Sequence, residues 1–414
     1  MTEQGESVRA AKVGRRFAAF ETRNFRLYFV GQVLSTVGTW SQTLAVTTLV
    51  FDLTGKSSQL GLTVALQFLP MLLLGAIAGV VADRYDNRHI LMTTSFLQGC
   101  LAVTYGVLAY TGNVSILTID LITVAFGSVS AFERTTMQAF APQLVPSEHT
   151  QSAIAMANTV NGTARMAGPA LAGFLVTQAG VAVCFFVNAS SFGLLLVALA
   201  LMRAREIRVR AMLTRAHGGI REGLRYVRAT PRVRTPIVVM LVIGTISYNF
   251  LVTVPSVVEF TFERGADSMG LVFGVSSVGT LIGAYLAAGV APSNARVAAS
   301  LVVMCGALTS LGLAPTFAWF VVSMVPMGMA SAYFQAMLVA MLLHESDAVV
   351  RGRVMSLYQI AWQGTTPIGT PLMGLVAQLT NARVPFVLAA VATGASAAVL
   401  ARPKRVERAR ATDS

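Results

Sequence analysis

Residues 60–100 read LGLTVALQFLPMLLLGAIAGVVADRYDNRHILMTTSFLQGC. An apolar run over 60–82 is followed by a short charged segment and then by a second apolar run over 90–111. About 20 apolar residues, each rising about 1.5 Å, cross the hydrocarbon core of a bilayer. The segment therefore predicts two membrane-spanning helices joined by a short charged loop.

The same pattern recurs along the chain and predicts twelve spans. The chain of 414 residues is 55% hydrophobic and 12% charged, and its mean hydropathy is +0.66. Soluble domains carry about 25% charged residues, so the composition indicates an all-α integral membrane protein. The spans are expected near 25–50, 60–82, 90–111, 115–137, 152–178, 182–202, 236–258, 268–290, 297–314, 317–342, 354–379 and 383–401.

Lysine and arginine are distributed unevenly across these spans. With the N-terminus in the cytoplasm, 27 of the 31 lie on the inner side; Lys56, Arg264 and Arg383 lie outside and Arg165 within a span. Basic residues resist translocation, so we expect a multi-pass protein of the inner (cell) membrane with both termini cytoplasmic. This bias and anionic lipid head groups explain the net charge of +13, which favours membrane lipids over nucleic acid as partners.

The longest hydrophilic stretch divides the spans six and six. The expected organisation is a cytoplasmic arm (1–23), a six-helix half (24–202), a basic cytoplasmic linker (203–235), a second six-helix half (236–401) and a cytoplasmic tail (402–414). In the linker, Ile220, Leu224 and Val227 recur at helical spacing. That spacing is compatible with an amphipathic helix on the inner membrane face or with a solvated charged linker.

Spaced glycines indicate that the two halves repeat each other. A shift of 201 residues places Gly168 on Gly369 and Gly173 on Gly374, and a shift of 209 places Gly61 on Gly270. Together with the six-plus-six division, these matches predict two pseudo-symmetric halves. Transporters with such repeats bind their substrate where the repeats meet.

The loop between the second and third spans reads Gly79-Val-Val-Ala-Asp83-Arg84-Tyr85-Asp86-Asn87-Arg88. It resembles the G-x-x-x-D-R-x-G-R-R signature of the major facilitator superfamily, and the resemblance extends over nearly the whole chain. Four further segments resemble the superfamily's drug- and siderophore-exporting branch, of the enterobactin-exporter type. They are Asn24-Phe-Arg-Leu-Tyr28, Gly38-Thr-Trp40, Asp52-Leu-Thr-Gly55 and Arg351-Gly-Arg-Val-Met-Ser-Leu-Tyr358.

The resemblance implies a charge cluster that gates the cytoplasmic side. In the family, a loop aspartate joins an acidic residue at the inner end of the fourth helix and a basic residue of the loop. Asp86 and Asn87 depart from the signature, so the basic member is Arg84 or Arg88, or is absent. The alternative is a tight charged turn that only maintains topology. The gating candidates are Asp83, Arg84, Arg88, Glu133 and Arg134.

The fifth span resembles the G-x-x-x-G-P-x-x-G-G pattern of the superfamily's antiporters. Gly168, Pro169 and Gly173 match it, whereas Ala164 and Ala172 stand where two of its glycines would be. The match implies export by antiport. Small residues also let helices approach closely, so tight packing of this helix is expected in either case.

Arg165 lies near the middle of the fifth span, where a cation costs about 2.5–3.5 kcal/mol on insertion scales. It shares a helical face with Asn158 and Asn161, and such a polar stripe is expected to line a cavity. Asp120, about five residues from the outer end of the fourth span, is the acidic residue of matching depth. We predict an Asp120–Arg165 pair that couples proton and substrate movement. The alternatives are a structural ion pair or an Asp120 placed among the lipid head groups.

Other spans carry uncharged polar residues. In the resembling family, helices 1, 4, 7 and 10 line the central cavity, which implies substrate contacts there, and the eleventh span carries a similar stripe. Each residue alone is also compatible with a simple helix–helix hydrogen bond. The cavity candidates are Gln32, Thr39, Asn158, Asn161, Tyr248, Asn249, Gln335 and Trp362.

The sequence contains no pattern typical of an enzyme. There is no nucleophile–base pair, phosphate-binding loop or metal-ligand spacing, and Cys100, Cys184 and Cys305 all lie within spans, so no cofactor is expected. We predict a monomeric secondary transporter that exports small amphipathic molecules, either drug-like compounds or siderophores, by proton-coupled alternating access. The alternatives are an exporter specific for one siderophore or metabolite, and a non-transporting ligand sensor of the same fold.

Overall fold

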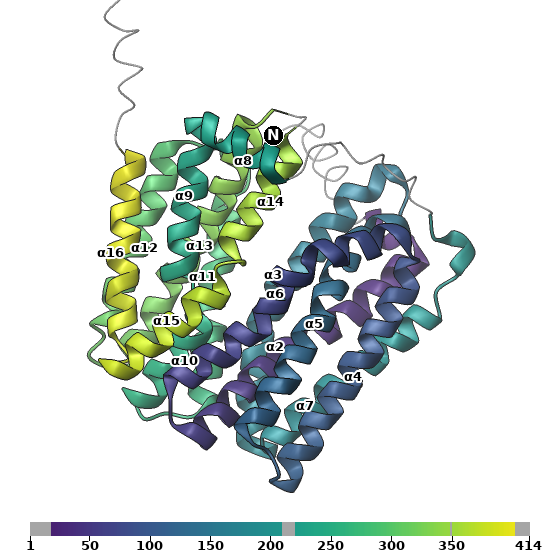
Figure 1. Ribbon diagram of the computed structural model, residues 1–414, viewed down its shortest axis with the longest axis horizontal. Coiled ribbons are helices and arrows are strands. Elements are labelled where there is room, and N and C mark those ends of the chain that lie inside the picture. Colours follow the sequence, from purple (N-terminus) through teal and green to yellow (C-terminus); the bar gives the residue numbers. More distant parts are fainter. Residues whose placement is uncertain (1–17, 209–219, 348–349, 402–414) are drawn as a thin grey trace, which may run out of the picture. The chain divides into compact units, whose positions relative to one another are not determined.

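The computed structural model describes residues 18–208, 220–347 and 350–401, and every regular element in these ranges is a helix (Figure 1). The arm before residue 18, part of the linker and the tail after 401 lie outside the described residues. The twelve spans correspond in chain order to α2 (Arg23–Thr54), α3 (Ser57–Arg84), α4 (Asn87–Thr111), α5 (Ile116–Phe140), α6 (Thr150–Ala179), α7 (Val181–Ala200), α9 with α10 (Pro231–Ile246 and Phe250–Phe260), α11 (Ala266–Ala287), α12 (Asn294–Gly312), α13 (Phe317–Glu345), α14 with α15 (Arg351–Trp362 and Thr366–Leu379) and α16 (Val384–Ala401).

These helices confirm the twelve-span prediction. Within the described ranges, nine segments are long and apolar enough to cross a membrane by length and composition alone. The other three spans are α2, α6 and the broken pair α14–α15. Short 3₁₀ helices and one linker helix complete the described elements: η1 (Ala18–Glu21), η2 (Ala141–Leu144), η3 (Ser147–His149), η4 (Ala204–Glu206) and α8 (Ile220–Ala229).

The seventh and eleventh spans are each interrupted, which the hydropathy pattern does not show. Between α9 and α10, the backbone N–H groups of Ser247 and Tyr248 both donate to the Ile243 carbonyl. The Asn249 amide donates to the carbonyls of residues 245 and 246 and so caps the end of α9. Between α14 and α15, a proline in the first turn of α15 removes a backbone donor, and the Thr365 hydroxyl donates to a carbonyl of the preceding turn. Side chains thereby supply hydrogen bonds that the broken helices cannot make.

The chain forms two compact units, whose boundaries differ from the expected halves at two places. Unit 1 comprises residues 1–55, 66–216 and 265–271, and unit 2 comprises residues 56–65, 217–264 and 272–414. The first residues of α3 therefore belong to unit 2, and the first residues of α11 belong to unit 1. These two exchanged segments, residues 56–65 and 265–271, each pack against a helix of the unit that contains them.

Glycines make both exchanged contacts possible. In unit 1, a Cβ on Gly173 of α6 would lie 3.2 Å from the Cα of Gly270. In unit 2, a Cβ on Gly374 of α15 would lie 3.3 Å from the Cα of Gly61, and the backbone N–H of Ser58 donates to the Gln378 side chain. The glycines that the sequence repeat aligns thus make equivalent contacts in the two units, because only glycine allows two helix backbones to come this close.

The linker contains the expected helix, α8, but its buried side packs on protein. Val227 is 4% exposed. A Cβ on Gly223 would lie 3.0 Å from the Arg353 side chain, and Glu222 forms an ion pair with Arg353 at 3.0 Å. One side of α8 therefore packs on protein at Arg353 of α14, and the placement of this helix on the inner membrane face stays a prediction. Leu224 is 37% exposed.

Candidate functional site

The contact between α2 and α6 places Arg165 on an aromatic ring. A Cβ on Gly168 would collide with the Cβ of Trp40, so glycine is needed for this approach. The Ser41 hydroxyl donates to the Gly168 carbonyl at 2.8 Å. One turn earlier on α6, the guanidinium carbon of Arg165 lies 5.4 Å from the centre of the Trp40 ring, a cation–π distance. The Arg165 side chain is exposed rather than enclosed between helices.

Asp120 lies at the fifth position of the 25-residue α5, and Arg165 at the sixteenth of the 30-residue α6. The Asp120 side chain is half-buried. It is within electrostatic reach of Tyr105, whose hydroxyl donates to the Ile119 carbonyl and shares a 2.6 Å hydrogen bond with Thr123. Asp120 therefore lies beside a buried polar contact between α4 and α5. Its pairing with Arg165 stays a prediction.

The polar residues of α2 mostly bond within the helix bundle. Gln32 is 4% exposed, and its amide donates to the Thr36 hydroxyl. Thr39 is half-buried and donates to a carbonyl of its own helix. Gln42 accepts a hydrogen bond from Asn188 of α7. Of the two α2 candidates, Thr39 is the more accessible. Asn158 and Asn161 lie on α6, but their side chains fall outside the described ones.

In unit 2, Tyr248 and Trp362 belong to an aromatic group beside the two helix breaks. The Ser331 hydroxyl of α13 donates to the Tyr248 hydroxyl at 3.0 Å. The rings of Trp362 and Tyr358 are 6.2 Å apart, and Tyr358 is within electrostatic reach of Tyr248. Sequence reasoning did not assign Ser331 or Tyr358, although Tyr358 ends the Arg351–Tyr358 segment of the family resemblance. Tyr358 and Trp362 share a helical register, and this spacing in the sequence could have predicted that their rings lie close together.

The other two candidates of unit 2 differ in accessibility. Gln335, on α13, is half-buried. Asn249 is only 1% exposed, and both hydrogen bonds from its amide nitrogen end on α9 carbonyls. Asn249 therefore holds the helix break together, whereas Gln335 is accessible for contact.

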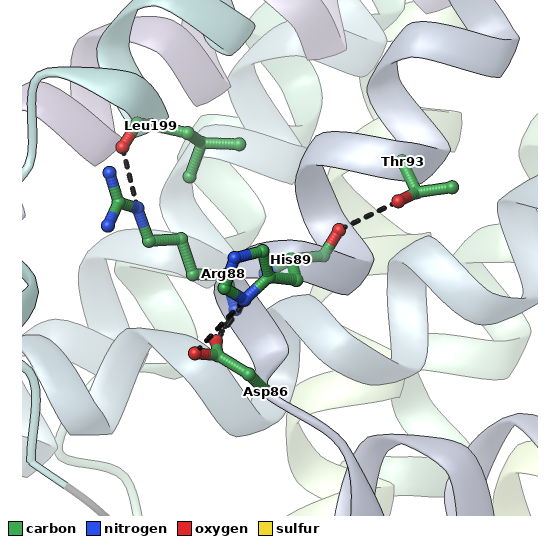
Figure 2. Close-up of polar contacts among 5 residues, drawn as sticks. All are labelled: Asp86, Arg88, His89, Thr93 and Leu199. Atoms are coloured by element: carbon green, nitrogen blue, oxygen red, sulfur yellow. Dashed lines mark hydrogen bonds and ion pairs between the residues drawn. The ribbon is translucent and has the colours of Figure 1, made fainter.

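The loop between α3 and α4 shows why an aspartate can replace the signature glycine. Asp86 is the N-cap of α4: its carboxylate accepts from the backbone N–H groups of Arg88 and His89 and lies 3.2 Å from Nδ1 of the His89 ring (Figure 2). The Arg88 side chain extends away from this cap and donates to the carbonyls of Leu199 and Ala200 at the end of α7. A cation at a helix C-terminus is stabilised by the helix dipole.

The other gating candidates lie in different surroundings. Asp83 and Arg84, at the end of α3, are exposed. Glu133 is 8% exposed and accepts a hydrogen bond from the Gln98 amide of α4 at 2.9 Å. The Arg134 guanidinium lies 5.9 Å from the centre of the Phe68 ring of α3. The Arg88 side chain thus bonds to α7, whereas the Glu133 side chain bonds to α4.

Twelve spans in two units, repeated glycine contacts, a charged turn between α3 and α4 and an arginine midway along a span are features of a membrane transporter of the major facilitator fold. The chain belongs to the family described as transmembrane secretion effector, whose pattern matches residues 15–414. The fold agrees: a D-xylose–proton symporter superposes with a TM-score of 0.74 at 14% identity, covering 91% of this chain and 96% of that one. A bacterial homologue of the lysosomal transporter Spinster, inward-facing and occupied, gives 0.73 at 13% identity, covering 91% and 95%.

Curated relatives are similar over different lengths. The uncharacterized MFS-type transporter YfiS of Bacillus subtilis is 25% identical over 220 residues, which is 51% of this chain and 51% of that protein. Macrolide efflux protein A of Streptococcus pyogenes is 22% identical over 375 residues, covering 85% and 89%. The enterobactin exporter EntS of Escherichia coli is 24% identical over 367 residues, covering 84% of each.

Proposed function

We propose that the protein exports small amphipathic molecules, drug-like compounds or siderophores, across the cytoplasmic membrane by proton-coupled alternating access. The family and two relatives that cover most of the chain, a macrolide efflux protein and an enterobactin exporter, support export. The antiporter-like segment of α6 supports antiport: Gly168 and Gly173 of this segment make close helix contacts, and Pro169 lies inside the helix.

The observation that carries the proposal is the exposed Arg165 on the Trp40 ring. A cation midway along a span costs about 2.5–3.5 kcal/mol and persists where it has a polar partner or water. Its exposure leaves the guanidinium accessible to an anionic or polar group of a substrate. Trp40, against which the guanidinium lies, supplies apolar surface for another part of an amphipathic molecule.

Transport in inside-out proteoliposomes tests this function. The purified protein, with a pH gradient imposed, is expected to accumulate a labelled macrolide or siderophore above the level of protein-free vesicles, and a protonophore is expected to abolish the accumulation. Accumulation of a single siderophore among many compounds would indicate a specific exporter. Saturable binding without any flux would contradict export and indicate a ligand sensor.

For the cytoplasmic gate, the proposal assigns Asp83 as the anionic member, with Arg84, Arg88, Glu133 and Arg134 as the other charged residues of the inner side. Asp83→Asn removes the negative charge proposed for the gate without changing the size of the side chain. We therefore expect this variant to lower transport at least tenfold. Substrate binding, measured by tryptophan fluorescence, should be unchanged. Asp86→Asn is the matched control, because asparagine is also a good N-cap. Equal transport in both variants would leave the loop a topology element.

The proposed orientation places both termini in the cytoplasm. In a background without Cys100, Cys184 and Cys305, we expect cysteine at the exposed positions of Lys56 and Arg264 to react with an impermeant maleimide in intact cells. Cysteine at the exposed Arg225 of α8 should react only after permeabilisation. Labelling at Arg225 in intact cells would invert the topology. A single species on native mass spectrometry would support a monomer.

A further inference from the structure

Glu133 is a carboxyl group enclosed within unit 1, at the contact between α4 and α5. Its side chain is 8% exposed, and that of its partner Gln98 is fully buried. The Gln98 amide nitrogen donates to Glu133 Oε2 and to the Ser130 hydroxyl, each at 2.9 Å. One amide therefore joins a carboxyl and a hydroxyl inside the helix bundle.

The other end of the same amide lacks a partner. Gln98 Oε1 is buried and accepts no hydrogen bond from the described residues, and the hydroxyls of Ser95 and Thr136 are likewise without one. A buried acceptor without a donor costs about 1–3 kcal/mol. The amide nitrogen of Gln98 thus has two acceptors, whereas the amide oxygen receives no hydrogen bond from the described residues.

A proton on Glu133 supplies that donor. A carboxylate can only accept hydrogen bonds, whereas a protonated carboxyl also donates one. Gln98 can serve both states: its N–H group faces a carboxylate, and its carbonyl oxygen can accept from a protonated carboxyl. The exchange needs only a rotation of the amide. Burial also disfavours the charged form of a carboxyl that has a single neutral donor.

The charged and titratable neighbours of Glu133 are compatible with both its protonated and its deprotonated form. On α5 itself, the adjacent Arg134 is within electrostatic reach of Glu133, and its guanidinium lies over the Phe68 ring of α3. From α2, the Tyr28 hydroxyl is within electrostatic reach of Glu133. From α4, the contact is the uncharged Gln98. Glu133 is seven residues before the end of α5, so it lies about 10 Å from that helix end.

We propose that Glu133 binds the transported proton and that Gln98 is the positioning residue that stabilises both protonation states. This rests on the proposed proton-coupled export and identifies the proton site within unit 1. Protonation moves one proton from water to a Glu133 oxygen, and deprotonation returns it. Glu133 is then a proton carrier in addition to the gating role that the family resemblance implies.

Infrared spectroscopy tests proton binding without any transport. At neutral pH, the purified parent protein is expected to show a protonated-carboxyl stretch that shifts in heavy water. This band should be absent from Glu133→Gln and present in the control Glu148→Gln, which changes an exposed carboxylate. Glu133→Asp should move the band. A spectrum of Glu133→Gln identical to that of the parent from mildly acidic to mildly alkaline pH would overturn the proposal.

Transport then separates proton carriage from a structural role. Glu133→Gln keeps the size and the hydrogen bonds, so we expect substrate exchange across the vesicle membrane to continue while pH-driven accumulation falls at least tenfold. Unchanged pH-driven accumulation would also overturn the proposal. If no substrate is found, the proposed function fails while the infrared result still decides the proton site.

Discussion

Replacing Arg165 with alanine is expected to abolish pH-driven efflux, bringing accumulation in vesicles to the protein-free level. The change removes the one cation that the described part of α6 places midway along the span, together with its contact to the Trp40 ring. Asp120→Asn should have the same effect if the two groups act together, and the double variant should be no worse than either single one. Transport of a labelled substrate measures all three.

Arg264→Ala is the matched control for this prediction. Arg264 also lies over an aromatic ring, 4.4 Å from the centre of Phe317, but outside the spans. The Arg264→Ala variant should transport the labelled substrate as the parent protein does. Arg165→Lys keeps the charge and loses the planar donor group, so partial transport would show that charge alone is insufficient. Efflux that survives Asp120→Asn with its proton dependence unchanged would exclude Asp120 from coupling and leave Glu133 as the acidic group of unit 1.

Gly168→Val is expected to produce the largest loss of stability. A Cβ at this position would collide with Trp40 Cβ and lie 2.9 Å from the Val37 carbonyl and 3.0 Å from the Ser41 nitrogen. Overpacking of this kind costs about 1–3 kcal/mol or more, and separation of the helices also breaks the Ser41–Gly168 hydrogen bond. We expect a melting temperature several degrees lower and a smaller folded fraction on size-exclusion chromatography.

Gly193→Val provides the comparison within unit 1. A Cβ on Gly193 of α7 would have no atom of a neighbouring helix within 4 Å, so a side chain there meets open space. Its variant should melt close to the parent protein. Equal melting of the Gly168 and Gly193 variants would contradict the role assigned to the α2–α6 contact.

The glycine repeat shows how far sequence alone could reach. Aligned glycines predicted two similar halves, and in the structure Gly173 meets Gly270 in unit 1 while Gly374 meets Gly61 in unit 2. The repeat could be detected in the sequence because a close contact between two helix backbones tolerates only glycine. Glycine therefore occurs at equivalent positions of the two halves. The partner of each glycine was not visible, because the partners lie far apart along the chain.

The polar candidates show where sequence reasoning stops. Gln32 and Asn249 match the expected stripe, yet Gln32 bonds within its own helix and Asn249 bonds to carbonyls at the end of α9. Arg88 matches the signature loop, yet it binds the end of α7. A polar residue in a span needs a hydrogen-bond partner in every case, so its presence indicates a partner without indicating whether that partner is a neighbouring helix, a substrate or a proton.

The sequence by itself determined the class, the number of spans and the expected orientation, because hydropathy, span length and the distribution of basic residues are properties of the chain read in order. Tertiary structure decided the breaks in the seventh and eleventh spans, the exchange of segments between the units and the pairing of Glu133 with Gln98. These depend on which groups meet across different helices. Hydrogen bonding and close packing act only between atoms in contact, and a linear pattern does not contain those contacts.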